Sequence, residues 1–238
     1  MYKTVQESVA TVTDLKSKVS DVTDREIVIC PVFTSLKSVC DALKGTNIKG
    51  GGQDLFWEEK GAFTGEISAQ MIKDTGCTYV IIGHSERRQY FHETNETVGK
   101  KILAALKSGL TPIVCVGEKL EERESGKTFA VNEKQIREGL GALSKEQVAK
   151  IVIAYEPVWA IGTGKVATPA QAEEVHIYIR KTIANMFGTE VADGTRILYG
   201  GSVKPENAAE LMSQKNIDGA LVGGASLEAD SFAKIIKY

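Results

Sequence analysis

The feature that most constrains the fold is a regular alternation of short apolar runs with longer amphipathic segments. The apolar runs lie at residues 27–30, 48–53, 79–83, 112–117, 151–155, 196–200 and 219–223. Strands that are apolar on both faces are typical of a parallel sheet covered by helices. Because no linker, low-complexity tract or internal repeat interrupts this pattern, we expect an α/β fold that forms one domain over residues 1–238.

Capping sequences mark the starts of several helices. Thr4 is followed three residues later by Glu7, and Thr168 by Gln171, which is the spacing of a capping box. A proline directly after Thr168 also suits the first helical turn. The second of these helices is expected to run to about residue 186, and Ser144 begins another by the same device.

The number of strands leaves two architectures open. A barrel closes with eight strand–helix units, whereas this chain shows seven apolar runs and opens on a helical segment. Either the sheet is open and doubly wound, or the fold is a barrel whose first strand is absent from this chain.

Composition excludes several classes of function. The net charge is −2 over 238 residues, so no basic surface predicts binding to nucleic acid or to an anionic membrane. No apolar run is long enough to cross a bilayer, and the opening residues do not resemble a signal peptide, so we expect a cytoplasmic protein. The four cysteines lack CxxC spacing, which argues against a metal site and favours reduced thiols.

Polar residues follow the predicted strands at the ends where sites form in α/β proteins. His84 follows the run at 79–83, Glu156 follows the run at 151–155, and Ser202 comes just after the run at 196–200. The carboxyl ends of parallel strands meet at one edge of a sheet or barrel, where ligands bind. Neither a dinucleotide-binding nor a P-loop glycine pattern is present in the sequence.

Glycine-rich turns late in the chain predict a phosphate site. The turns at 200–202 and 223–226 offer backbone N–H groups and hydroxyls, and the second turn opens the last predicted helix. In a barrel these turns follow the last two strands, which is the usual place for a phosphate. Gly162 lies in a third glycine-rich turn and adds to the prediction.

The three histidines have different settings. His84 precedes the first turn of a helix, whose amides disfavour an imidazolium, so we expect a neutral ring that donates a hydrogen bond. His92 and His176 lack this setting and are interpreted as structural or solvated. The charged segment at 117–127 is interpreted as a solvated loop and helix edge.

Five sequence motifs resemble those of the triosephosphate isomerase family. They are GAFTGEIS at 61–68, GHSERR at 83–88, AYEPVWAIGTGK at 154–165, YGGSV at 199–203 and LVGGASL at 221–227. Their order and spacing agree over the whole chain. The resemblance implies a (β/α)8 TIM barrel and the interconversion of dihydroxyacetone phosphate and glyceraldehyde 3-phosphate, in glycolysis and gluconeogenesis, without cofactor or metal.

The resemblance also assigns roles to residues. Glu156 matches the catalytic base that acts through an enediolate, and His84 matches the neutral electrophile. Both roles are well known in this family. Glu86 matches an acidic residue behind the site, and residues 157–167 match the mobile lid. The positions that match the phosphate-holding groups are Gly162, Ser202, Gly223 and Gly224.

The family is usually a homodimer. The resemblance implies that the loop Asp54–Thr64 inserts beside the partner's site, with Thr64 near the partner's catalytic groups.

Two departures from the family pattern stand out. The family begins with a strand that ends in Asn-x-Lys, whereas Met1 here matches the position just after that lysine, and Lys3 is displaced along the following helix. Losing one such preorganised donor typically costs roughly 3–4 kcal/mol of transition-state stabilisation. The second departure is the run Gly50–Gly52, because a strand tolerates one glycine better than three.

Three explanations of the absent strand remain open: a start at an internal methionine of a longer chain, which we favour, a deliberate truncation, or a natural inactive relative. The alternative function is a non-catalytic phosphate-binding or interaction protein on the same scaffold. Another phosphosugar isomerase or lyase lacks support, because no strand ends in a lysine suited to a Schiff base.

Overall fold

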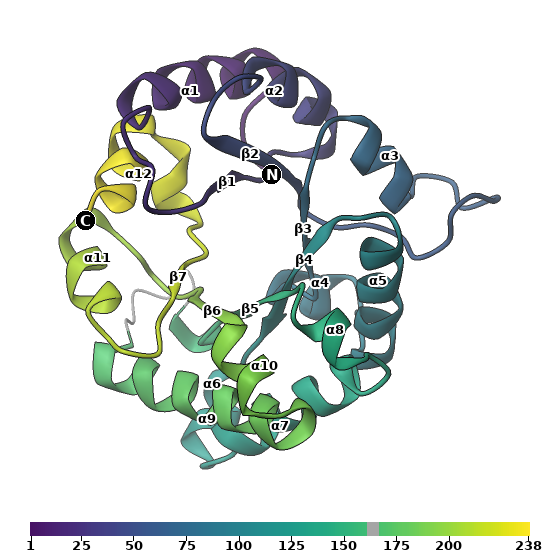
Figure 1. Ribbon diagram of the computed structural model, residues 1–238, viewed down its shortest axis with the longest axis vertical. Coiled ribbons are helices and arrows are strands. Elements are labelled where there is room, and N and C mark those ends of the chain that lie inside the picture. Colours follow the sequence, from purple (N-terminus) through teal and green to yellow (C-terminus); the bar gives the residue numbers. More distant parts are fainter. Residues whose placement is uncertain (161–166) are drawn as a thin grey trace.

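The computed structural model describes residues 1–160 and 167–238 of the chain. In that part, seven parallel strands form one sheet, and each strand pairs with the next along the chain. The strands are β1 (Ile27–Ile29), β2 (Ile48–Gly52), β3 (Tyr79–Ile82), β4 (Thr111–Val116), β5 (Val152–Tyr155), β6 (Arg196–Tyr199) and β7 (Gly219–Ala220). Figure 1 shows the strands in a ring with the helices outside them.

Helices separate successive strands. The longer ones are α1 (Val5–Lys18), α5 (Asn95–Lys107), α7 (Thr128–Leu140) and α9 (Pro169–Phe187). The shorter ones are α2 (Leu36–Ala42), α3 (Ala69–Asp74), α4 (Ser85–Tyr90), α6 (Leu120–Glu124), α8 (Lys145–Val148), α10 (Thr189–Gly194), α11 (Pro205–Met212) and α12 (Ala229–Ile236). Three 3₁₀ turns, η1 (Phe33–Ser35), η2 (Val158–Ala160) and η3 (Gly224–Leu227), complete the described part.

The predicted elements are present, with small shifts at their ends. Both capping boxes form, because Thr4 accepts from the Glu7 amide and Thr168 from the Gln171 amide. The seventh strand ends at residue 220 rather than 223, since β7 pairs only with β6 in the described residues. The last predicted helix begins at Ala229, because the glycine turn before it forms η3 instead.

Strand order decides between the two architectures left open by the sequence. A doubly wound sheet reverses its strand order at a switch point. Here the order follows the chain from β1 to β7 without reversal, and the helices lie outside the ring (Figure 1). The fold is therefore of the barrel type with seven strands, and within the described residues no ladder joins β1 to β7.

The central strands β3, β4 and β5 are buried on both faces, as their composition predicts, whereas β1 and β7 at the open edges are only partly buried. Val80 and Ile82 of β3 belong to the large cluster beneath the helices. Tyr79 and Ile81 of the same strand pack inside the ring with Ile113 and neighbouring residues. This two-sided packing holds the carboxyl ends of the strands in a rigid frame.

Crowding by neighbouring side chains explains why β2 contains three glycines. A Cβ at Gly50 would lie 2.5 Å from the Sγ of Cys40, and one at Gly51 would lie 2.8 Å from the Sγ of Cys30. A Cβ at Gly52 would meet Ile72 at 3.1 Å. The expectation that a parallel strand tolerates such a run poorly is therefore wrong here, because neighbouring side chains fill the space that side chains of β2 would need.

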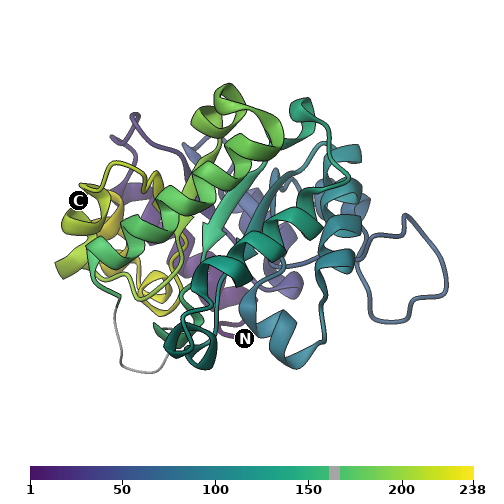
Figure 2. The same ribbon diagram turned by 90° about the horizontal axis from the view of Figure 1, so that it is seen from below.

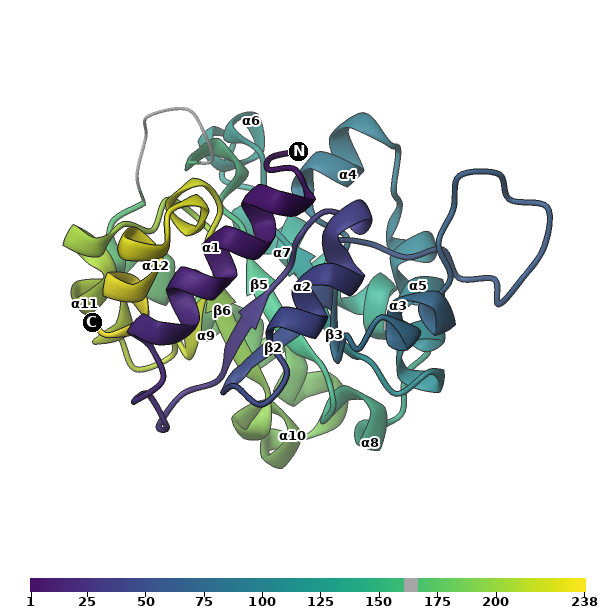
Figure 3. The ribbon, with the colours of Figure 1, turned by 90° about the horizontal axis from the view of Figure 1, so that it is seen from above.

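The loop between β2 and α3, residues 53–68, projects from the body of the molecule, as Figure 2 and Figure 3 show from opposite sides. Among the described helices, none is both long and apolar enough to cross a membrane.

Candidate active site

Glu156 is held at the carboxyl end of β5 with its side chain only 2% exposed. Its backbone N–H donates to Val116 O at 2.7 Å, which continues the ladder to β4. Gly117 makes this approach feasible, since a Cβ there would lie 1.7 Å from the Glu156 carbonyl oxygen. One carboxylate oxygen, Oε2, accepts from the Ser85 N–H at 2.9 Å.

His84 lies against the second oxygen of this carboxylate. Its Nε2 is 2.9 Å from Glu156 Oε1, and the ring is 26% exposed. As the N-cap of α4, His84 accepts the Glu86 N–H at Nδ1, 3.2 Å away. A ring whose Nδ1 accepts carries its proton on Nε2, the ring atom next to Glu156, although Oε1 accepts no hydrogen bond of good geometry from the described residues.

Two influences act on the charge of His84. Burial opposes the cationic form, but the contact with Glu156 and the charges of Glu156 and Glu86 outweigh it, so the pKa of His84 lies above its ordinary value. The sequence predicted a neutral ring from the helix amides alone. The sequence did not reveal that the carboxylate of Glu156, 72 positions further along the chain, lies against the ring and raises the pKa of His84.

Glu86 points away from this pair. Its side chain is 68% exposed, and its Oε2 lies 3.8 Å from His84 Nδ1. Glu86 contributes to the site through its backbone amide, which donates to His84 Nδ1 and orients the imidazole.

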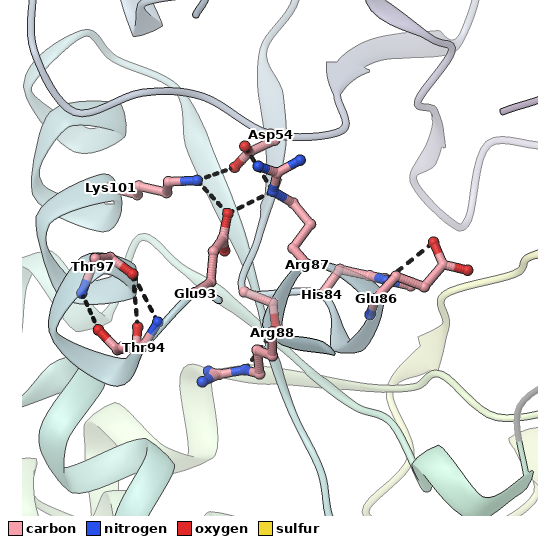
Figure 4. Close-up of polar contacts among 10 residues, drawn as sticks. Asp54, His84, Glu86, Arg87, Arg88, Glu93, Thr94, Thr97 and Lys101 are labelled. Carbon is pink, nitrogen blue, oxygen red and sulfur yellow. Dashed lines mark hydrogen bonds and ion pairs between the residues drawn. The ribbon is translucent and has the colours of Figure 1, made fainter. Parts of the chain in front are cut away.

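A buried ionic network positions the start of α4 (Figure 4). Arg87 lies 2.8 Å from Asp54 and 2.5 Å from Glu93, and Lys101 lies 2.6 Å from Asp54 and also contacts Glu93. Burial opposes the charge of Glu93, but hydrogen bonds from Lys101 and Arg87 lower its pKa below the ordinary value. The network joins the helix that carries His84 to α5 and to the base of the projecting loop.

The glycine turns face the same cavity as the acid and the imidazole. This cavity has a volume of about 1950 Å³ and runs through the ring, since Glu26 and Arg196 line it at the amino ends of the strands. At the carboxyl ends its lining includes His84, Glu86, Glu156, Ser202, Gly223 and Gly224. Gly200 packs against the acid, since a Cβ there would lie 3.0 Å from Glu156 Cγ. Nothing lies within 4 Å of the position that a Cβ would take at Gly223 or Gly224, so their backbone is open to a ligand.

Part of the predicted lid lies outside the described residues. Gly162 and the rest of 161–166 belong to that part. On the near side, Ala160 is buried and its N–H donates to Pro157 O at 2.7 Å. On the far side, Ala167 is buried next to the cap of α9.

Glu118 is a residue that sequence reasoning missed. It is fully buried and accepts from Tyr155 Oη at 3.1 Å, Trp159 Nε1 at 2.9 Å and Asn132 Nδ2 at 3.2 Å. The interpretation of 117–127 as a solvated segment is therefore wrong at this position. Glu118 comes directly after a strand and Gly117, so the signal that identified His84 and Glu156 would have found it.

His92 and His176 do not belong to the site. His92 is exposed, whereas His176 lies on the buried face of α9 with its Nδ1 3.0 Å from Asn216 O. Within the described residues, no three or more His, Cys, Asp or Glu side chains gather as metal ligands would.

The fold and the cavity define a class of protein: a barrel-type α/β enzyme with a buried acid and an imidazole in contact at the carboxyl ends of parallel strands. Comparison with known proteins narrows this class. The family model described as triosephosphate isomerase matches residues 1–238. This chain belongs to the triosephosphate isomerase family and is an isomerase.

Individual relatives support the assignment. Triosephosphate isomerase of Endomicrobium trichonymphae is 61% identical over all 238 residues, which cover 95% of that protein. The enzyme of the same name from Geotalea uraniireducens is 56% identical over the same span. The crystal structure of triosephosphate isomerase from Bartonella henselae superimposes with a TM-score of 0.89 at 42% identity, covering 99% of this chain and 93% of that one.

Proposed function

We propose that this chain interconverts dihydroxyacetone phosphate and glyceraldehyde 3-phosphate through an enediolate, as a step of glycolysis and gluconeogenesis in the cytoplasm. The observation that carries the proposal is the 2.9 Å contact between Glu156 and His84 in the cavity that the late glycine turns also line. An acid and an imidazole that face the same cavity suit a substrate whose carbonyl and acidic carbon are adjacent.

Glu156 acts as the base. To reach a substrate carbon, its carboxylate leaves the Ser85 amide and the His84 ring, both 2.9 Å away. A lid over residues 157–167 that closes on the substrate would exclude water and strengthen the base. The near end of this segment is held by the hydrogen bond from Trp159 Nε1 to Glu118.

His84 acts as the electrophile. Once substrate separates Glu156 from the ring, the main influence that raises the pKa of His84 is removed, and the helix amides favour the neutral form. The Nε2–H then donates to the substrate carbonyl oxygen, where negative charge develops. Glu86 positions this ring through its amide.

Ser202, Gly223, Gly224 and Gly162 hold the phosphate. The open backbone at Gly223 and Gly224 supports this role, because glycine lets a phosphate oxygen approach the amides closely. Binding energy from this non-reacting group would then be available to hold the lid closed and orient the reacting carbons.

A coupled isomerase assay on the chain and its Glu156→Gln variant tests the proposal. We expect the variant to lower kcat roughly a thousandfold, the scale of a general base. Binding of 2-phosphoglycolate should persist, because the phosphate seat is untouched. Glu121→Gln, an exposed acid on α6, should leave kcat unchanged.

The same assay separates the alternative function. A second version of the chain carries a family-type first strand ending in Asn-x-Lys before Met1. If both versions are inert while 2-phosphoglycolate still binds, the chain is a phosphate binder and the proposal fails.

We also propose that the chain forms a homodimer through the projecting loop, Asp54–Thr64. Phe63 on this loop is 42% exposed, and its ring lies 4.7 Å from that of Phe56. Aromatic groups held on a projecting loop mark an interaction surface, since the loop cannot bury them itself.

A further inference from the structure

Two buried cysteines far apart in the sequence meet in the core beside β2. Cys40 is in the last turn of α2, and Cys77 is in the turn between α3 and β3. They are separated by 37 positions, and their sulfur atoms lie 3.5 Å apart. Both are free thiols, with exposed fractions of 8% for Cys40 and 1% for Cys77.

The surrounding backbone is shaped around these sulfur atoms. A Cβ at Gly50 would lie 2.5 Å from Cys40 Sγ and 3.6 Å from Cys77 Sγ, so only glycine leaves both in place. The Thr78 N–H donates to Gly50 O at 2.9 Å, which holds the turn of Cys77 beside β2. A Cβ at Gly76 would lie 3.3 Å from Cys40 Cβ, so this turn also packs directly on Cys40.

The two thiols differ in acidity. Hydrogen bonds from Cys40 and from the Thr75 hydroxyl, 3.3 Å from the sulfur, lower the pKa of Cys77 to about 7 against the effect of burial. The same contact and burial raise the pKa of Cys40. The 3.5 Å contact allows either sulfur to donate, and the directions of the two pKa shifts favour Cys77 as the thiolate and Cys40 as the donor.

Each of the two cysteines has an exposed neighbour in the sequence. Gly76, next to Cys77, is exposed, and so is Asp41, next to Cys40. Because the sulfur atoms themselves are buried, their oxidation requires a local opening of one of these turns.

We propose that Cys40 and Cys77 are a site of reversible disulfide formation by hydrogen peroxide. The Cys77 thiolate attacks a peroxide oxygen, breaking the O–O bond to give a sulfenic acid and hydroxide. The Cys40 sulfur then attacks the Cys77 sulfur, forming the S–S bond and expelling the oxygen as water with the Cys40 proton. Overall, two thiols lose two protons and two electrons, and one peroxide becomes two waters.

The sulfur atoms must approach from 3.5 Å to about 2.05 Å, the length of a disulfide. The cross-link would tie α2 to the amino end of β3, whereas His84 follows the carboxyl end of that strand. It should therefore stabilise the fold without touching the acid–imidazole pair.

The test is to treat the native chain with hydrogen peroxide, block the remaining thiols under denaturing conditions, and map the peptides by mass spectrometry. We expect two of the four thiols to be lost, and the Cys40 and Cys77 peptides to be joined with a mass two hydrogens lower. Dithiothreitol should restore all four. Four thiols after treatment, or a bond that involves Cys30 or Cys115, would overturn the proposal.

Variants define the order of the two steps. Cys40→Ser should stop at a sulfenic acid on Cys77, which dimedone traps, and Cys77→Ser should form no intrachain disulfide. The matched control Cys30→Ser should still lose two thiols. Two results together would refute the proposed order of steps: dimedone labels Cys40 in the Cys77→Ser chain, and it does not label Cys77 in the Cys40→Ser chain.

A thermal melt of the unmodified sequence provides a readout that needs no variant. Closing a loop of 37 residues should raise the Tm of the oxidised chain by about 5–10 °C over the reduced chain. An oxidised chain that melts no higher than the reduced one would show that the bond distorts the packing, against the proposal.

Discussion

At the scale of single residues, the sequence did not predict how burial changes the pKa of individual polar side chains. His176 is fully buried, and burial lowers its pKa to about 4 from an ordinary 6.5. The folded chain therefore binds this proton less readily than the unfolded chain. Its contribution to stability is fully present above about pH 6.5 and is lost as the pH falls toward 4.

His176→Gln should consequently flatten the pH dependence of stability. Between pH 7 and pH 5, the free energy of unfolding of the unsubstituted chain should fall by about 2 kcal/mol more than that of the variant. Urea unfolding at both pH values measures this difference. His92→Gln, at an exposed histidine, should behave like the unsubstituted chain, and equal slopes for all three chains would contradict the assignment.

At the scale of elements, the buried ionic network joins α4, α5 and the projecting loop. Lys101 on α5 is 3% exposed and contacts both Asp54 and Glu93. Removing the cation leaves two buried carboxylates with only Arg87 to compensate them. The loss of one partner from a buried charge pair is strongly destabilising, because the remaining charge has no solvent to stabilise it.

Lys101→Met should lower the free energy of unfolding by about 3–5 kcal/mol, measured by urea denaturation. The matched control is Lys100→Met, because the preceding lysine is half-exposed, pairs with Glu96 at the surface and lies over the Trp57 ring. That control should change stability by less than about 1 kcal/mol. If both variants lose the same amount, the network is not a source of stability.

At the scale of the whole molecule, the proposed homodimer predicts that the projecting loop, residues 54–64, forms the interface. We expect light scattering to give a mass of about twice 25.7 kDa. Phe63→Asp should shift the molecule to the monomer, because a carboxylate cannot be buried unpaired in an interface. Ile177→Asp, on the exposed face of α9, should remain dimeric. A monomeric unsubstituted chain, or a dimeric Phe63→Asp chain, would contradict the proposed interface.

The elements and the positions of Glu156, Ser202 and the glycine turns could be read from the sequence, because they depend on local patterns. Apolar runs predict strands wherever both faces are covered, and a residue that follows such a run lies at a carboxyl end. Capping boxes at Thr4 and Thr168 are equally local, since each joins residues three positions apart.

What only the tertiary structure decided depends on contacts between distant segments. The charge of His84 depends on Glu156, the role of Glu118 on Tyr155 and Trp159, and the space at Gly50 on Cys40 and Cys77. No periodicity in the chain encodes these neighbours, because they are brought together by the closing curvature of the sheet. Composition and spacing therefore determine the frame of this isomerase, whereas burial and long-range proximity determine which of its polar groups are charged, paired or reactive.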